Sequence, residues 1–136
     1  MVFASAARIG LGLKMESRRF RELRGEVAIV TRYGQVIRVR PDRLEEYRRY
    51  HAEVWPGILD MIRQCHIRNY SIFHKDGFLF AYFEYVGDDL DADMAKMAAD
   101  PETQKWWDIV KPMQEPLETR AEGEWWANME EVFHTD

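Results

Sequence analysis

Two apolar segments joined by a tight-turn signal constrain the fold of this chain most strongly. Residues 67–74 and 78–86 are rich in aromatic and β-branched side chains, and Lys75-Asp76-Gly77 separates them. An Asp-Gly pair between two such segments is typical of a β-hairpin, because both residues tolerate a positive φ. The chain is therefore expected to contain an antiparallel sheet.

The segment 78–86 also predicts that both faces of this sheet are covered. Its alternate residues are apolar on either side, with Leu79, Ala81 and Phe83 on one face and Phe78, Phe80 and Tyr82 on the other. If helices cover one face, the second is an association surface. A second copy of the sheet is the simplest cover, so we expect a homodimer.

The first strand and helix are expected in residues 34–65. Residues 34–40 suit a strand that Pro41 ends, and Asp42 with Glu45 matches a capping box at a helix start. Pro56-Gly57 interrupts the helical pattern, which resumes after a kink and ends near His66.

A second helix and a last strand follow the hairpin. Leu90, Met94 and Met97 have helical spacing, and Asp100-Pro101 restarts the helix with an N-cap aspartate and a first-position proline. A polar connection over residues 113–123 leads to alternating residues 129–134, which predict a final strand. This order is that of an α+β, ferredoxin-like fold, a four-stranded antiparallel sheet with helices on one face. Two copies would form a dimeric α+β barrel.

Length and composition favour one domain and exclude several partners. The chain has 136 residues, 46% of them hydrophobic, so residues 33–136 can form a single domain and residues 1–32 an N-terminal extension. The 19 Lys and Arg are interspersed with 24 Asp and Glu, which offers no basic surface for nucleic acid. No apolar segment approaches the roughly twenty residues that span a membrane. The single cysteine, Cys65, favours a reducing, cytoplasmic setting.

Tyr47, His51 and Trp55 lie on one face of the first expected helix, because residues at i, i+4 and i+8 align. Histidine titrates near neutrality, so His51 is the leading acid/base candidate. The alternative is a surface histidine packed on Tyr47. Trp55 precedes Pro56 at the kink and is expected to be a packing residue.

Other aromatic residues are candidate ligand contacts. Tyr47 and Tyr70 each carry a phenolic hydroxyl, and Trp106-Trp107 offers indole surfaces. Adjacent helical residues point about 100° apart, so one of the two tryptophans is expected in the core. The pair Trp125-Trp126 has no evident partner.

The sequence contains no pattern for a metal or an organic cofactor. His66, His74 and His134 form no metal-binding motif, and no glycine-rich phosphate loop is present. The second acid/base group is open among a tyrosine, a bound water and a carboxylate, for which the candidates are Glu53, Glu84, Asp108 and Glu131.

The chain from Tyr33 to Phe133 resembles the L-rhamnose mutarotases. The motifs that carry this resemblance, in order along the chain, are Tyr47-Arg48-Arg49-Tyr50-His51 with Trp55-Pro56, Asn69-Tyr70, Gln104-Lys105-Trp106-Trp107 and Glu131-Val132-Phe133. The resemblance implies a small ferredoxin-like homodimer, an isomerase of L-rhamnose metabolism that interconverts the α and β anomers of the sugar without a metal or an organic cofactor.

By position, His51 matches the proton donor of that family, and Tyr47, Tyr70, Trp106 and Trp107 match its sugar-binding residues. The chain departs from the family in its N-terminal extension and in a longer acidic connection before the last strand. Two other functions fit the same features. One is a dimeric α+β-barrel monooxygenase or decarboxylase-like enzyme, and the other is a non-catalytic sugar-binding or sensor domain.

Overall fold

The computed structural model describes Gly25 and residues 29–136. Most of the expected extension, residues 1–32, thus lies outside the described residues, while Thr31 and Arg32 already belong to the first strand. Along the chain the elements are β1 (Thr31–Val39), a 3-10 turn (Pro41–Arg43), α2 (Leu44–Ala52), α3 (Pro56–Gln64), β2 (Ile67–Lys75), β3 (Phe78–Tyr85), α4 (Leu90–Ala99), α5 (Pro101–Val110), a second 3-10 turn (Lys111–Met113), β4 (Gln114–Glu115) and β5 (Ala127–Met129).

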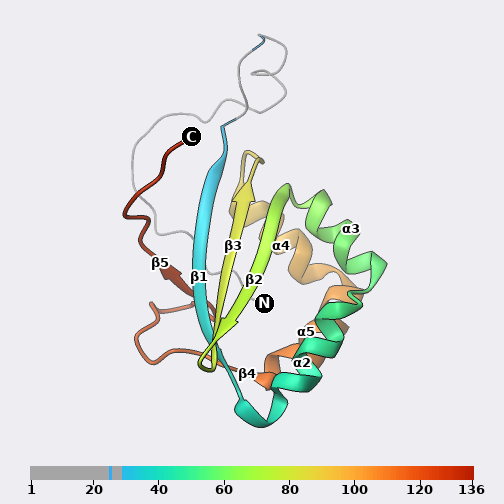
Figure 1. Ribbon diagram of the computed structural model, residues 1–136. Coiled ribbons are helices and arrows are strands. Elements are labelled where there is room, and N and C mark those ends of the chain that lie inside the picture. The colour runs from blue at the N-terminus through green and yellow to red at the C-terminus, as the bar shows by residue number, and fades with distance from the viewer. Residues whose placement is uncertain (1–24, 26–28) are drawn as a thin grey trace.

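The sheet is antiparallel, and helices α2 to α5 lie against one of its faces (Figure 1). Its strand order is β2-β3-β1-β4, and β5 also pairs with β1. The expected α+β class and antiparallel sheet are therefore confirmed. The sheet has five strands and not four, because two short strands occupy the edge of β1 where one was expected.

The hairpin between β2 and β3 forms as predicted. Asp76 and Gly77 have φ angles of 54° and 81°, which are the positive values that a tight two-residue turn requires. Nearer the start of β2 the register shifts between Arg68 and Ser71, and Asn69 has a φ of 48°. A bulge of this kind changes the direction in which the neighbouring side chains point, including that of Tyr70.

The predicted capping box is wrong. Helix α2 begins at Leu44 after Arg43, and no side chain caps it. Pro41, Asp42 and Arg43 instead form a 3-10 turn, and Arg43 donates from Nε to Glu46 Oε2 at 2.8 Å. Proline at the start of this turn places Asp42 inside it, so its carboxylate does not cap the following helix.

The expected interruption at Pro56-Gly57 separates two helices. Helix α2 ends at Ala52, and α3 begins at Pro56, the first-turn position that proline favours. The predicted restart of the next helix is confirmed as well. Asp100 caps α5 by accepting from the Thr103 backbone nitrogen at 2.9 Å, and Pro101 follows it.

The C-terminal part differs most from the expectation. The final strand is Ala127–Met129, so the predicted strand over residues 129–134 is wrong beyond its first residue. The polar connection also contains β4, in which Gln114 is buried. Both strands are short, since β4 pairs with β1 through two residues and β5 through three.

The main core lies between the sheet and helices α2, α3 and α5. Ile37, Leu79 and Ala81 on the strands pack there with Tyr47 and Trp106 from the helices. Within the described residues, no helix combines the length and apolar character needed to cross a bilayer.

Candidate active site

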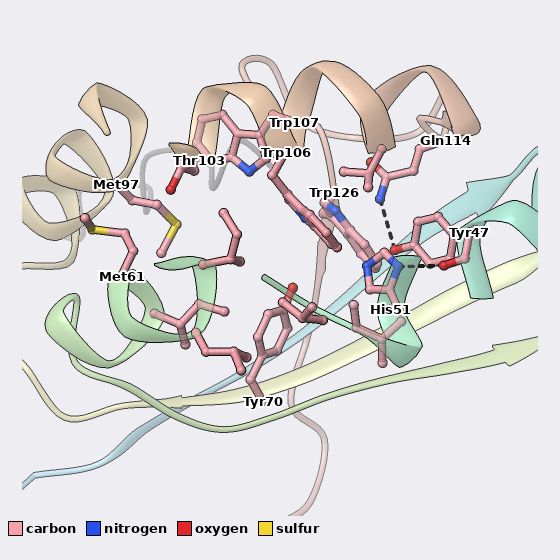
Figure 2. A pocket seen from close by; sticks show the side chains of 16 residues that line it. Tyr47, His51, Met61, Tyr70, Met97, Thr103, Trp106, Trp107, Gln114 and Trp126 are labelled. Atoms are coloured by element: carbon pink, nitrogen blue, oxygen red, sulfur yellow. Dashed lines mark hydrogen bonds between the residues drawn. The ribbon is translucent and has the colours of Figure 1, made fainter. Parts of the chain in front are cut away.

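A cavity of about 280 Å³ lies between the helical layer and the inner face of the sheet (Figure 2). Its wall is mostly apolar or aromatic, with a few polar side chains, as in small-molecule sites generally. The lining residues are Tyr47, His51, Val54, Ile58, Leu59, Met61, Ile62, Tyr70, Ile72, Met97, Thr103, Trp106, Trp107, Val110, Gln114 and Trp126.

His51 lies at one end of this cavity, in the last turn of α2. Its Nδ1 is 2.8 Å from the backbone oxygen of Tyr47. A carbonyl oxygen can only accept, so Nδ1 carries a proton, and in the neutral ring Nε2 is the free acceptor. Burial lowers the pKa of His51 below its ordinary value of 6.5, while the bond to the Tyr47 carbonyl partly offsets this shift. The neutral ring with an open Nε2 is thus the dominant form at neutral pH.

Tyr47 packs one helical turn before His51, and their rings stack with centroids 4.0 Å apart. The Tyr47 side chain is only 4% exposed, and burial raises the pKa of its hydroxyl to about 12. This hydroxyl is therefore protonated throughout the physiological range, and it can act as a hydrogen-bond donor or as a weak acid.

Gln114, in β4, connects Tyr47 to the C-terminal part of the chain. Its Nε2 donates to the Tyr47 hydroxyl oxygen at 3.3 Å, and its Oε1 accepts from Trp125 Nε1 at 2.8 Å (Figure 2 shows the first of these bonds). The side chain is 3% exposed. Buried amides of this kind normally have their hydrogen bonds satisfied, as this one does.

The tryptophan pair on α5 forms a second wall of the cavity. Trp106 is buried and meets the rings of His51 and Trp55 edge to face, with centroid distances of 5.3 Å and 5.2 Å. Trp107 is half-buried and lies under the ammonium of Lys111, 4.9 Å from Nζ to the ring centroid. Both line the cavity, although Trp106 also belongs to the core as expected of one of them. Trp55 supports Trp106 from outside the cavity, which confirms it as a packing residue.

Tyr70 reaches the cavity from the sheet, on the opposite side from the tryptophans (Figure 2). It follows the bulge at Asn69, and its ring packs edge to face on Phe83 with centroids 5.8 Å apart. Removal from water raises the pKa of Tyr70 well above its ordinary value of 10. Like Tyr47, it is therefore a neutral phenol at physiological pH.

None of the described residues that line the cavity is a carboxylic acid. The four carboxylates considered from the sequence, Glu53, Glu84, Asp108 and Glu131, are not among them. Among the described residues of the wall, His51 is the strongest base, and the ionisable acids are the hydroxyls of Tyr47 and Tyr70. The arrangement can accept one proton at the imidazole and donate another from a phenol or a bound water.

All five site residues expected from the sequence, His51, Tyr47, Tyr70, Trp106 and Trp107, line the same cavity. Sequence reasoning missed Gln114 and Trp126, which reach the cavity from the C-terminal segment. The unexplained aromatic pair Trp125-Trp126 was the available signal, because two indoles in a polar connection indicate a segment that returns to the core.

A second histidine, His66, belongs to a hydrogen-bonded cluster outside this cavity. His66 Nδ1 is 2.9 Å from Asp93 Oδ2, and the Tyr85 hydroxyl donates to the same oxygen at 2.5 Å. Cys65 Sγ is buried beside it, 3.2 Å from the backbone oxygen of Asp93. This cluster joins the start of β2 to α4, so it links secondary-structure elements and lines no part of the site.

Comparisons with known proteins place the chain in a family. A family model described as L-rhamnose mutarotase matches residues 32–135. The L-rhamnose mutarotase of Lactiplantibacillus plantarum is 34% identical over 109 residues, which make up 79% of this chain and 100% of that protein. The L-rhamnose mutarotase of Oceanobacillus iheyensis is 32% identical and covers 77% of this chain and 98% of its own length.

Two solved structures share the fold. The crystal structure of an L-rhamnose mutarotase from Formosa agariphila superposes with a TM-score of 0.62 at 21% identity, over 78% of this chain and 99% of that one. Tetracenomycin F2 cyclase from Streptomyces glaucescens, a polyketide cyclase, gives a TM-score of 0.56 at 19% identity, over 77% and 95%. The same α+β architecture thus occurs in proteins named for different reactions. The fold alone therefore does not identify the reaction, and the function has to be inferred from the cavity residues.

Proposed function

This chain belongs to the L-rhamnose mutarotase family, and we propose that it is an isomerase that interconverts the α and β anomers of L-rhamnose in the cavity lined by His51. The observation that carries this proposal is the convergence of His51, Tyr47, Tyr70, Trp106 and Trp107 on that one cavity. They come from three separate elements, α2, β2 and α5, and only the fold brings them together.

His51 is proposed as the proton-transfer residue at the anomeric oxygen. Because Nδ1 is held by the Tyr47 carbonyl, Nε2 accepts the proton of the anomeric hydroxyl as the bond between C1 and the ring oxygen breaks. After rotation about the C1–C2 bond, the ring closes on the other face of the aldehyde. His51 then returns the proton to the anomeric oxygen, so the same imidazole is base in one half-reaction and donor in the other.

The remaining wall suits a 6-deoxy sugar. Trp106, Trp107 and Tyr70 offer flat apolar surfaces to the C–H groups and the C6 methyl. The Thr103 hydroxyl and the tyrosine hydroxyls can be hydrogen-bond partners for sugar hydroxyls. A sugar with one misplaced hydroxyl would leave buried polar groups unpaired, which is the stronger basis for discrimination.

The proposed reaction moves protons and breaks one C–O bond, and it needs no oxidant or group donor. We therefore propose that the enzyme uses no metal and no organic cofactor. A cytoplasmic location stays a prediction, supported by the single cysteine in the chain.

A ferredoxin-like dimeric α+β barrel is proposed as the assembly. The strand order β2-β3-β1-β4 is compatible with the ferredoxin-like topology. The sheet face opposite the helices carries apolar side chains that a second copy could cover, since Phe73 is 64% and Met129 42% exposed. Phe73 pairs in register with Phe80, which extends this patch across two strands.

Saturation-transfer NMR on the anomeric protons of L-rhamnose tests the proposed activity. We expect purified protein to increase the exchange rate between the α and β signals in proportion to its concentration. A folded sample that leaves the exchange rate at the buffer value would contradict the proposal and favour the sensor alternative. L-fucose and L-mannose, tested in parallel, measure the selectivity for hydroxyl stereochemistry and for the C6 methyl.

A further inference from the structure

The orientation of the Gln114 amide is set by its neighbour Trp125. An indole N–H can only donate, so the atom 2.8 Å from Trp125 Nε1 is the amide oxygen. The amide nitrogen then faces the Tyr47 hydroxyl, 3.3 Å away. The two ends of this amide would otherwise be interchangeable, and Trp125 removes that ambiguity.

The direction of the next hydrogen bond follows from this orientation. An amide N–H₂ has no acceptor capacity, so the Tyr47 oxygen must accept from Gln114. Its own proton then needs another acceptor, and among the described residues the Tyr47 hydroxyl donates to none. Tyr47 lines the cavity together with His51, so a ligand or a water there can take this hydrogen bond.

We propose that Tyr47 is the catalytic acid that protonates the ring oxygen of the sugar, and that Gln114, held by Trp125, is the positioning residue that keeps the Tyr47 proton available to the cavity. This inference rests on the proposed mutarotase function and assigns the second proton transfer that the reaction requires. The backbone carbonyl of Tyr47 also orients His51, because it accepts a hydrogen bond from Nδ1.

Each proton that moves in this step has a stated donor and acceptor. In ring opening, His51 Nε2 gains the proton of the anomeric hydroxyl, and the electron pair of that O–H bond forms the C1 carbonyl. The bond between C1 and the ring oxygen breaks, and the ring oxygen takes the proton of Tyr47. Ring closure reverses both transfers, so the phenolate regains its proton and the imidazolium becomes neutral.

The surroundings favour this use of Tyr47. An alkoxide is a stronger base than a phenolate, so proton transfer from tyrosine to the departing ring oxygen is downhill. Burial raises the pKa of Tyr47, whereas the hydrogen bond from Gln114 lowers it, because the amide N–H stabilises the phenolate. Among the described residues, His51 and Tyr70 share the cavity wall with Tyr47, and Arg48 and His74 line a second hollow beside it. Lys111 lies next to Trp125, with its Nζ 5.5 Å from the ring centroid.

Tyr47→Phe is the first test, because it removes the proton and keeps the ring that stacks on His51. General acid catalysis typically contributes about 10²- to 10⁴-fold, so we expect kcat for L-rhamnose anomer exchange to fall at least 100-fold. Tyr70→Phe should act mainly on KM and lower kcat less than tenfold. The matched control is Tyr50→Phe on the same helix, outside the cavity, which should leave kcat and KM unchanged.

Gln114→Glu tests the positioning role through a pH profile. The carboxylate would accept from both Trp125 and the Tyr47 hydroxyl, so the phenolic proton would turn away from the sugar. Protonation of the carboxyl supplies an O–H that again donates to the Tyr47 oxygen. We therefore expect kcat of Gln114→Glu to rise as the pH falls, across a range where the wild-type kcat is constant.

Gln114→Met is the second variant, which keeps an unbranched side chain of similar length but no donor. We expect roughly a ten- to hundredfold loss of kcat with little change in KM, since a buried hydrogen bond to a charged group is lost in the transition state. Thermal unfolding of each variant confirms that it is folded.

Three results would overturn the inference while leaving the mutarotase function intact. The first is a kcat of Tyr47→Phe within threefold of an active wild type. The second is a pH dependence of kcat in Gln114→Glu that parallels the wild type, and the third is an unchanged kcat in Gln114→Met. An inactive wild type would instead remove the function on which the inference rests.

Discussion

Two histidines in this protein each use Nδ1 in one hydrogen bond and have different roles. His51 lies in the last turn of α2, and His66 lies just after the end of α3. His51 donates to a backbone carbonyl and lies in the wall of the cavity, whereas His66 faces the carboxylate of Asp93 away from it. The comparison separates a site histidine from a structural one by partner and location.

The partner determines what each imidazole can do. The Tyr47 carbonyl orients the His51 ring in the cavity wall, whereas the Asp93 carboxylate ties His66 to α4. Burial lowers the pKa of His51, so its Nε2 is a free base at neutral pH. The His66 cluster resembles a catalytic dyad in residue type, but its Asp93 oxygen is already shared with the Tyr85 hydroxyl. It therefore fixes α4 to the sheet.

The largest effect is expected from His51→Asn. Asparagine keeps a donor for the Tyr47 carbonyl but has no basic nitrogen, so catalysis of L-rhamnose anomer exchange should fall roughly 100-fold or more. Stopped-flow polarimetry measures the rate. His66→Asn is the matched control and should retain the wild-type kcat. Comparable losses in the two variants would break the distinction between the histidines.

Asp93→Ala should have the largest effect on stability. The Asp93 side chain is 16% exposed, and its removal leaves the Tyr85 hydroxyl and His66 without their acceptor. We expect the free energy of unfolding to fall by about 2 kcal/mol, as for other buried hydrogen bonds to a charged group. Urea denaturation measures this change. An unchanged unfolding midpoint would show that the cluster is not a structural link.

The pH dependence of activity sharpens the role of His51. Its folded-state pKa is lowered from 6.5, so the base form persists through neutral pH and is lost only as the pH falls below that value. The expected kcat/KM is constant above pH 6.5 and declines on the acidic side, approaching tenfold per pH unit once the imidazole is protonated. A decline that begins above pH 7 would mean that another group controls the reaction.

The smallest effect is expected from His66→Asn on stability. The His66 side chain is 40% exposed, so solvent screens its pair with Asp93, and such pairs contribute about 0 to 1 kcal/mol. Thermal unfolding should therefore show a shift much smaller than that of Asp93→Ala. A larger shift for His66→Asn than for Asp93→Ala would reverse their proposed order.

Features set by neighbouring residues were predictable from the sequence. The Asp76-Gly77 turn and the Asp100 cap depend on backbone preferences within a few residues, and both form as expected. The stacking of His51 on Tyr47 was also predictable, because residues four apart lie on the same face of a helix.

Features set by distant contacts were not predictable. Gln114 lies 67 residues after Tyr47, and its pairing depends on where β4 meets the edge of β1. The final strand was misplaced for the same reason, because Val132 and Phe133 have a strand-like pattern but no strand beside them within residues 29–136. Periodicity identifies an extended segment, whereas the pairing of a short edge strand is decided by its partner.

A crystal structure with L-rhamnose bound tests the central claim most directly. The account predicts the anomeric oxygen within hydrogen-bond distance of His51 Nε2, about 2.7–3.2 Å, with the ring oxygen facing the Tyr47 hydroxyl. Sugar density beside His66 and Asp93, or in the cavity with the anomeric carbon turned away from His51, would contradict it.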